Sequence, residues 1–201
     1  MRIVVIGANG TIGRVVYNKL IDKGYDVTEV YHSSGDYRVD IRQPESIQEL
    51  FKKTGKHDAI VSCVGKAYFG SFNEMTLEDY YTGFEHKVMG QVALVKIGIE
   101  YLNPGGSFTL TTGITCDDPI PYGTGLAMAN GALNAFVKNT AINLENDIRI
   151  NAVSPGLLEL SAEKLGSFFP GHTPVPTSKV INAYLKSIEG KITGQIIRVQ
   201  G

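Results

Sequence analysis

The sequence lacks an apolar run long enough to cross a membrane, which takes roughly 18–20 residues. Its first apolar segment, Arg2–Ile6, gives way to glycine within a few residues. This pattern is typical of a buried first strand and not of a signal peptide. We therefore predict a cytoplasmic protein with no membrane partner.

Charge of one sign is also missing. The chain of 201 residues carries 19 Lys and Arg against 20 Asp and Glu, which gives a net charge of −1. Proteins that bind nucleic acids or acidic membranes gather basic patches on their surface. The near-neutral balance therefore predicts no nucleic-acid partner.

Cysteine is scarce, and no metal-binding pattern is present. In a cytoplasmic protein Cys63 and Cys116 are expected to be free thiols. Cys63 ends an apolar run and is predicted to pack in the core, whereas Cys116 lies in a polar loop with no obvious base beside it. The histidines and the acid pair at 117–118 form no spacing typical of metal ligands, so we predict no metal.

Short apolar segments alternate with segments of helical periodicity along the whole chain. Strand–helix–strand repetition indicates parallel strands with helices on both faces of one sheet, in an α/β domain covering residues 1–201. The predicted strands are residues 2–6, 26–30, 58–63, 107–112, 148–153 and 195–199. The predicted helices are residues 12–23, 44–54, 75–102, 125–145 and 177–188, and the third is expected to be two helices that meet near Glu85.

The stretch GANGTIG follows the first predicted strand and precedes a helix, which is the context of a phosphate-binding turn. Gly7 permits the tight turn, Gly10 removes a side chain where a pyrophosphate approaches, and Gly13 lets the helix pack closely. The helix N-terminus offers free N–H groups to the anion. A plain tight turn is the alternative, because the spacing differs from the G-x-G-x-x-G of most dinucleotide dehydrogenases. The predicted cofactor residues here are Gly7, Asn9, Gly10, Thr11, Ile12 and Gly13.

The end of the second predicted strand bears on the choice between NAD and NADP. An acid there binds the ribose 2′-hydroxyl and repels a 2′-phosphate, but the stretch VYHSSGD has none where the strand should end. His32, Ser33 and Ser34 can donate to a 2′-phosphate, which favours NADP(H), while NAD and a plain polar turn remain alternatives. Further on, Asp40, followed by Ile41, is placed to accept a hydrogen bond from an adenine amino group.

These motifs resemble the short-chain dehydrogenase/reductase family, in order and over essentially the whole chain. GANGTIG looks like its glycine motif, VDI (39–41) like its adenine-side aspartate motif, and INAVSPG (150–156) like its sixth strand and Pro-Gly turn near the nicotinamide. The resemblance implies a Rossmann-type, doubly wound parallel sheet of about seven strands in three α/β/α layers. It also implies a homodimer or homotetramer built on two long helices. The further cofactor residues implied are Cys63, Val64, Gly65, Pro155 and Gly156.

The departures from the family concern the chemistry. The family uses a tyrosine for proton transfer and a lysine one helical turn later, which lowers the pKa of the phenol and binds the nicotinamide ribose. The similarity of GALNAFV to the family's helix places Leu126 at the tyrosine and Asn130 at the lysine. Leucine has no titratable proton and asparagine has no charge, so acid–base catalysis needs a substitute.

Three residues are candidate substitutes. Lys87 stands where the family has an asparagine, so Lys and Asn are exchanged, and we hypothesise that Lys87 replaces the missing ammonium; a surface lysine is the alternative. Tyr122, four residues before Leu126, either replaces the phenol or lines the pocket mouth. Thr112 is the predicted hydroxyl that holds the substrate oxygen, with Gly113 at the alternative register. The predicted catalytic set is Thr112, Tyr122, Lys87 and Asn130.

Three functions follow from these observations. The first is an NADP(H)-dependent oxidoreductase that acts on a small carbonyl or alcohol substrate with a rearranged site. The second is a catalytically inactive dinucleotide-binding sensor or scaffold, which Leu126 and Asn130 favour. The third is a partner-binding module without nucleotide, against which the intact GANGTIG turn argues.

Overall fold

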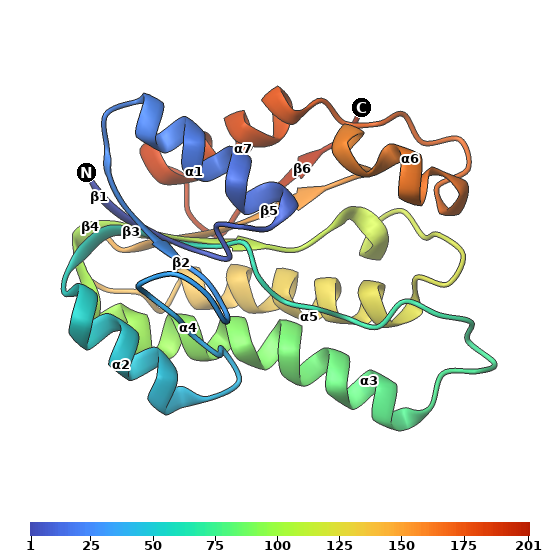
Figure 1. The fold of residues 1–201 in the computed structure, drawn as a ribbon, viewed down its shortest axis with the longest axis horizontal. Coiled ribbons are helices and arrows are strands. Elements are labelled where there is room, and N and C mark those ends of the chain that lie inside the picture. Colours follow the sequence, from blue (N-terminus) through green and yellow to red (C-terminus); the bar gives the residue numbers. More distant parts are fainter.

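The computed structural model describes residues 1–201 and contains one sheet in which all neighbouring strands are parallel. Its strands are β1 (Arg2–Ile6), β2 (Asp26–Val30), β3 (His57–Ser62), β4 (Leu102–Thr111), β5 (Arg149–Pro155) and β6 (Ile196–Val199). Their order across the sheet is β2-β1-β3-β4-β5-β6 (Figure 1). The predicted doubly wound parallel sheet is confirmed.

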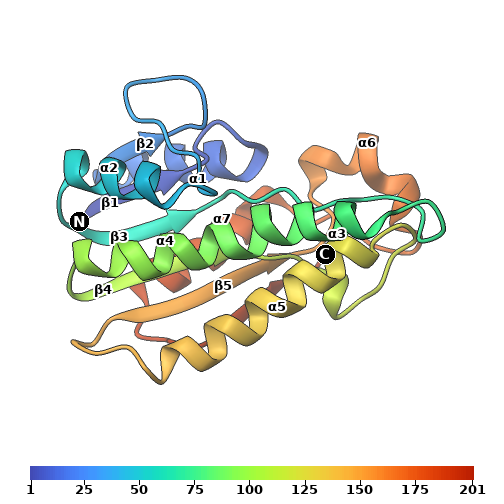
Figure 2. The ribbon, with the colours of Figure 1, turned by 90° about the horizontal axis from the view of Figure 1, so that it is seen from below.

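The helices cover both faces of the sheet and complete three layers. They are α1 (Thr11–Asp22), α2 (Pro44–Thr54), α3 (Leu77–Phe84), α4 (Gly90–Gly98), α5 (Thr124–Ala141), α6 (Ala162–Leu165) and α7 (Thr177–Glu189). Figure 1 shows α1 and α7 on one face, and Figure 2 shows α2, α4 and α5 side by side across the other. No helix has both the length and the apolar character needed to span a bilayer.

The sheet has six strands, whereas the family resemblance implied about seven. The segment after β2 returns to the sheet edge only through an isolated parallel bridge between Tyr31 and Arg38. A parallel neighbour needs a crossover of about a dozen residues or more, usually a helix. These two residues are too close in sequence for one, and no further edge strand forms.

The predicted junction near Glu85 is a single turn of π-helix, Glu85–Met89, here called the π-turn. Residues Glu85–Met89 link α3 to α4 without a break in helical backbone conformation. Such π-turns occur frequently at functional sites. The turn brings Lys87 and Val88 to the buried side of the helix.

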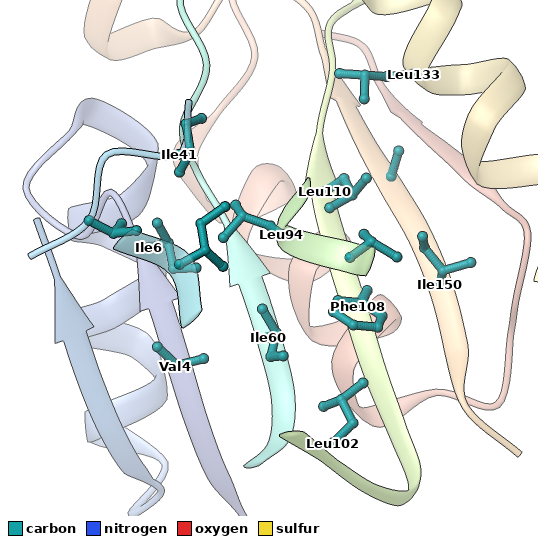
Figure 3. Packing of buried hydrophobic residues seen from close by; sticks show 14 of the residues in the cluster. Val4, Ile6, Ile41, Ile60, Leu94, Leu102, Phe108, Leu110, Leu133 and Ile150 are labelled. Atoms are coloured by element: carbon teal, nitrogen blue, oxygen red, sulfur yellow. The ribbon is translucent and has the colours of Figure 1, made fainter. Parts of the chain in front are cut away.

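Alternate residues of the central strands feed two separate apolar cores. Val4 and Ile6 point to the face covered by α2, α4 and α5, whereas Ile3 and Val5 point to the face covered by α1 and α7, as the two-residue period of a strand requires. All four are fully buried. The residues of the first core labelled in Figure 3 are Val4, Ile6, Ile41, Ile60, Leu94, Leu102, Phe108, Leu110, Leu133 and Ile150.

Successive strands extend the sheet in one direction from β1 to β2 and in the opposite direction from β3 onward. From β1 it winds to β2 at one edge, and β3 then pairs on the other side of β1. Ligands of doubly wound sheets bind in the crevice at the carboxyl ends of the strands at such a switch point. The turn that begins at Gly7 and the segment that begins at Cys63 both leave the sheet there, and N of Cys63 donates to O of Ile6 at 2.8 Å.

Candidate cofactor cleft and active site

The glycine-rich turn has the geometry of a phosphate site. Gly7 has a φ of +85°, and a Cβ there would lie 2.5 Å from Cγ1 of Val64. A Cβ on Gly13 would overlap the carbonyl oxygen of Gly7. These two glycines are therefore required by the packing of the protein itself.

Gly10 is different, because the protein has space for a side chain there. The only atom within 4 Å of an added Cβ is O of Gly7, at an ordinary distance of 3.4 Å. Gly10 caps α1 without a side-chain hydrogen bond, and the first turn of α1 contains no acid. The open surface and the uncapped N–H groups fit a bound pyrophosphate.

A cavity of about 290 Å³ adjoins this turn at the carboxyl ends of β1, β2 and β3. Its lining residues are Ile6, Gly7, Tyr31, His32, Val39, Asp40, Ile41, Arg42, Val64, Gly65, Lys66 and His86. It thus brings together six of the predicted cofactor residues, from Gly7 through His32, Asp40 and Ile41 to Val64 and Gly65. Its volume and its place at the switch point suit an adenosine group.

The other predicted residues of this region lie around the cavity. Asn9 and Thr11 are exposed on the glycine turn, and Ile12 is half-buried. Ser33 and Ser34 are exposed in the loop after β2 and do not line the cavity. Of the stretch His32–Ser34, only His32 reaches the predicted ribose site.

Arg42 supplies a positive charge in the cavity that the sequence analysis did not include. Its guanidinium donates to both carboxylate oxygens of Asp40, at 2.9 and 2.6 Å, and contacts Nε2 of His86 at 3.4 Å. The hydrogen bond from Arg42 holds the pKa of Asp40 at about 2. The side chain of Asp40, predicted to accept from adenine, is thus already engaged by a cation.

Lys87 is buried, so it is not a surface lysine. Only 8% of the residue is exposed, and its Cγ lies 3.0 Å from the point that a Cβ on Gly65 would occupy. Burial lowers the pKa of the Lys87 amine to about 8, against a smaller opposing effect of Cys116. The side chain of Lys87 therefore packs from the π-turn against the segment that follows β3.

Gln91, which the sequence analysis missed, fixes this arrangement. Its Nε2 donates to the carbonyl oxygens of Lys87 at 3.3 Å and Thr111 at 3.0 Å. Its Oε1 accepts from Oγ of Ser62 at 2.9 Å and from N of Thr111 at 3.2 Å. One fully buried side chain therefore joins the π-turn to the ends of β3 and β4. Its position one helical turn after Lys87 was the only signal in the sequence.

Asn130, at the family's lysine position, faces the segment after β4. Its Nδ2 donates to Oγ1 of Thr115 at 3.0 Å, and its Oδ1 is buried without a partner. A Cβ on Gly113 would lie 2.9 Å from Nδ2 of Asn130, so glycine permits this approach. Four residues on, Nδ2 of Asn134 contacts Sγ of Cys116 at 3.1 Å. Thr115 is a second hydroxyl at the site that the sequence analysis did not single out.

Thr111, the last residue of β4, and Thr112, which follows it, have different surroundings. Oγ1 of Thr111 donates to O of Ser62 and pairs with the hydroxyl of Tyr184, both at 2.6 Å. Oγ1 of Thr112, the predicted substrate-binding hydroxyl, has only a long bond of 3.4 Å to O of Val153. Thr112 is therefore the less constrained hydroxyl, although it is only 4% exposed.

Tyr122 precedes α5 and is half-exposed. Its φ is +61°, and its ring lies edge-on against Phe69 at 6.2 Å and Phe168 at 5.9 Å. The rings of Phe69 and Phe168 are 4.9 Å apart. These three residues, here called the aromatic cluster, join the loops after β3, before α5 and after α6. Leu126, at the family's tyrosine position, is half-buried on the first turn of α5.

The remaining predicted cofactor residues lie at the ends of β3 and β5. Cys63 is half-buried, and burial raises the pKa of its thiol to about 12, which makes it unreactive. Pro155 ends β5, and Gly156 lines a separate cavity of about 380 Å³ with His172 and Asp118. No group of three or more His, Cys, Asp or Glu side chains is arranged to hold a metal ion.

Comparison with known proteins places this geometry in a family. A family model described as enoyl-(acyl carrier protein) reductase matches residues 13–174. The solved structure of the protein lin1944 from Listeria innocua is 46% identical over 98% of each chain, with a TM-score of 0.95. A small-chain dehydrogenase solved in complex with NADPH is 28% identical over 100% of this chain and 96% of that one, with a TM-score of 0.87.

One curated protein is similar over most of its own length. General stress protein 39 of Bacillus subtilis is 26% identical over 98% of this chain and 82% of its own length. The chain belongs to the short-chain dehydrogenase/reductase family of oxidoreductases, whose members bind nicotinamide dinucleotides.

Proposed function

We propose that the protein is an NADP(H)-dependent oxidoreductase that interconverts a small carbonyl compound and the corresponding alcohol at a rearranged site. The observation that carries this proposal is the open phosphate turn at Gly10 beside the adenosine-sized cavity. Packing within the protein does not require glycine at position 10, because an added Cβ would meet only one atom, whereas a bound phosphate would require it.

The preference for NADP(H) rests on charge. His32 and Arg42, after β2, and Lys66, after β3, line the cavity with the single acid Asp40, and a guanidinium is the side chain best suited to a phosphate. The acid within β2, Glu29, is engaged by the hydroxyl of Tyr31. The NADPH complex of the related small-chain dehydrogenase supports the same choice.

The chemistry follows from the polar groups beyond the cavity. A bound nicotinamide supplies or accepts a hydride. Thr112 and Thr115 offer hydroxyls to orient the substrate oxygen, and Oδ1 of Asn130 is a buried acceptor without a partner. Lys87 provides a buried positive charge, and the aromatic cluster joins the loops after β3, before α5 and after α6.

Leu126 favours a second candidate function. A half-buried leucine where the family has its phenol is what we expect of a cofactor-binding sensor or scaffold without turnover. In that case the nucleotide binds as proposed, but no carbonyl compound oxidises it. Binding and turnover must therefore be measured separately.

The test of cofactor binding is a thermal-shift titration with NADP⁺, NADPH, NAD⁺ and NADH. A ligand at about a hundred times its Kd adds roughly 2.7 kcal/mol of stability, or about 5–10 °C in Tm for a chain of this size. We expect the larger shift with the phosphorylated pair. Gly10→Val should remove the shift without a loss of fold, whereas Gly166→Ala, also at an unfilled position, should retain it. No shift with any nucleotide would refute the proposal.

We also infer a homodimer or homotetramer built on α4 and α5. Their outer surfaces form a groove lined by Val95, Ile99, Phe136 and Leu144, among others. The two helices lie side by side on one face of the sheet (Figure 2). Light scattering should give at least twice the mass of the chain, and Phe136→Glu should reduce it to that of the monomer.

A further inference from the structure

Lys87 is a buried amine without a counterion. The residue is 8% exposed and forms no salt bridge, and its Nζ is not among the fully buried polar atoms that lack a partner. No carboxylate affects its pKa. A buried charge costs free energy unless it is paired, so an unpaired lysine beside a ligand cleft is a candidate functional group.

The position of Lys87 is fixed by backbone and packing. Its carbonyl is held by Gln91 in the π-turn, and its side chain lies against Gly65, which also lines the adenosine-sized cavity. The side chain of Lys87 therefore packs against the cofactor side of the crevice, and its amine lies within electrostatic range of Cys116, in the segment after β4.

The charged groups around Lys87 point elsewhere. Within the π-turn, Glu85 is exposed and His86 contacts Arg42. The one titratable group near the amine is Cys116, on the turn Ile114–Cys116. Asp117 beside it is held by Arg198, at 2.9 and 2.8 Å. From α5, Asn130 presents an uncharged amide.

We propose that Lys87 is the proton donor and acceptor of the reaction, and thus takes the role of the family's tyrosine and not that of its lysine. This inference rests on the proposed function. During reduction the carbonyl carbon receives the hydride, and the substrate oxygen forms an O–H bond as an N–H bond of the Lys87 ammonium breaks. The neutral amine then regains a proton from water.

The acidity of Lys87 suits this role. Burial lowers the pKa of the amine to about 8, so near neutral pH it is mostly protonated yet releases its proton readily. A proton donor is most effective when its pKa lies near the working pH. An exposed lysine, with a pKa of about 10.4, holds its proton too strongly.

The first measurement needs neither substrate nor cofactor. The protein is labelled with carbon-13 lysine, and the Cε resonances are followed from neutral to alkaline pH. Comparison with Lys87→Met assigns the Lys87 signal, and Lys186→Met, which removes an exposed lysine of α7, is the matched control. We expect Lys87 to titrate near pH 8 and well below the others. Titration together with the exposed lysines would overturn the proposal.

The second measurement separates proton transfer from cofactor binding. A panel of aldehydes and ketones is screened with NADPH, and the best substrate is used for wild type, Lys87→Met and Lys87→Arg. We expect kcat to fall by about 10²–10⁴-fold in both variants, with Kd for NADPH unchanged. Wild-type kcat for reduction should also decline above pH 8, as the amine loses its proton.

The outcomes distinguish the two levels of inference. Full kcat in Lys87→Met would overturn the assignment of the proton donor and leave the proposed oxidoreductase intact. A weaker Kd for NADPH with kcat retained at saturation would show a ribose-binding lysine, which also overturns it. Absence of nucleotide binding in the wild type would refute the proposed function itself, and with it this inference.

Discussion

Nε2 of Gln91 donates a hydrogen bond to the carbonyl oxygen of Lys87 at 3.3 Å, and the same amide holds both backbone groups of Thr111. The turn that carries the candidate proton donor is thus attached directly to the end of β4. All the side-chain hydrogen-bonding groups of Gln91 are used within the protein. This makes it a positioning residue and not a group that contacts substrate.

Replacement of Gln91 by methionine should release Lys87. The amine gains access to water in Gln91→Met, so its pKa should rise from about 8 toward the ordinary value. The alkaline limb of the kcat profile should move to higher pH by the same amount. Gln48→Met, at an exposed position of α2, should change neither. If Gln91→Met lowers stability while the Lys87 titration stays in place, Gln91 has only a structural role.

Arg42 should determine the preference between the two cofactors. Loss of a charged hydrogen bond to a phosphate costs about 1.5–3 kcal/mol, so Kd for NADP⁺ should rise roughly 10–150-fold in Arg42→Met. Kd for NAD⁺ should change little, because it lacks the 2′-phosphate. The matched control is Arg198→Met, which breaks a similar bidentate pair with Asp117 outside the cavity. An equal loss for both nucleotides would contradict a 2′-phosphate contact.

Substitutions of Gly13 and of Gly10 should differ in their effect on the free energy of unfolding. Gly13→Ala places a Cβ against the carbonyl oxygen of Gly7 and should destabilise the free protein by about 1–3 kcal/mol. Gly10→Ala meets no close atom and should leave the free energy of unfolding nearly unchanged. Urea unfolding of the two variants without nucleotide tests this difference. Equal destabilisation would mean that Gly10 is also needed for packing.

His57 should make the protein sensitive to acid. It is fully buried, its Nε2 bonds Oγ1 of Thr54 at 3.0 Å, and its Nδ1 has no partner. Burial lowers the pKa of His57 from 6.5 to about 4 in the folded protein. Between these values the unfolded chain binds more protons. The free energy of unfolding should therefore decrease as the pH is lowered from 6.5 to 4, by roughly 3 kcal/mol in all.

The pH dependence of His57 can be isolated with one variant. Urea unfolding is measured between pH 7 and 4 for wild type and His57→Leu. The variant should lose the part of the slope between pH 6.5 and 4 and keep the part due to carboxylates. Identical slopes would show that His57 is accessible to water and titrates normally.

The sequence predicted those features that local patterns encode. The six apolar segments became the six strands, the glycine turn lies between β1 and α1, and the junction expected near Glu85 is the π-turn. Strand burial depends on the regular sheet, and the steric need of Gly13 depends on its neighbour Gly7 in the same turn. These features could therefore be predicted from the sequence alone.

The missed features depend on contacts between distant segments. Gln91 looks like an ordinary polar helix residue until the ends of β3 and β4 surround it, and Arg42 gains a role only because α2 begins beside the cavity. Thr115 faces Asn130 because Gly113 lets the backbone approach α5. The additional strand expected from the family is absent because the segment after β2 is too short for a crossover.

The aromatic cluster links loops that are far apart in the chain. Phe69, Tyr122 and Phe168 each contact the other two rings edge-on, and each such pair contributes about 0.5–1.5 kcal/mol beyond its buried area. One loop cannot move outward alone without breaking two of the three pairs. Outward movement of any one loop therefore costs about 1–3 kcal/mol in lost ring pairs, which couples the three loops energetically.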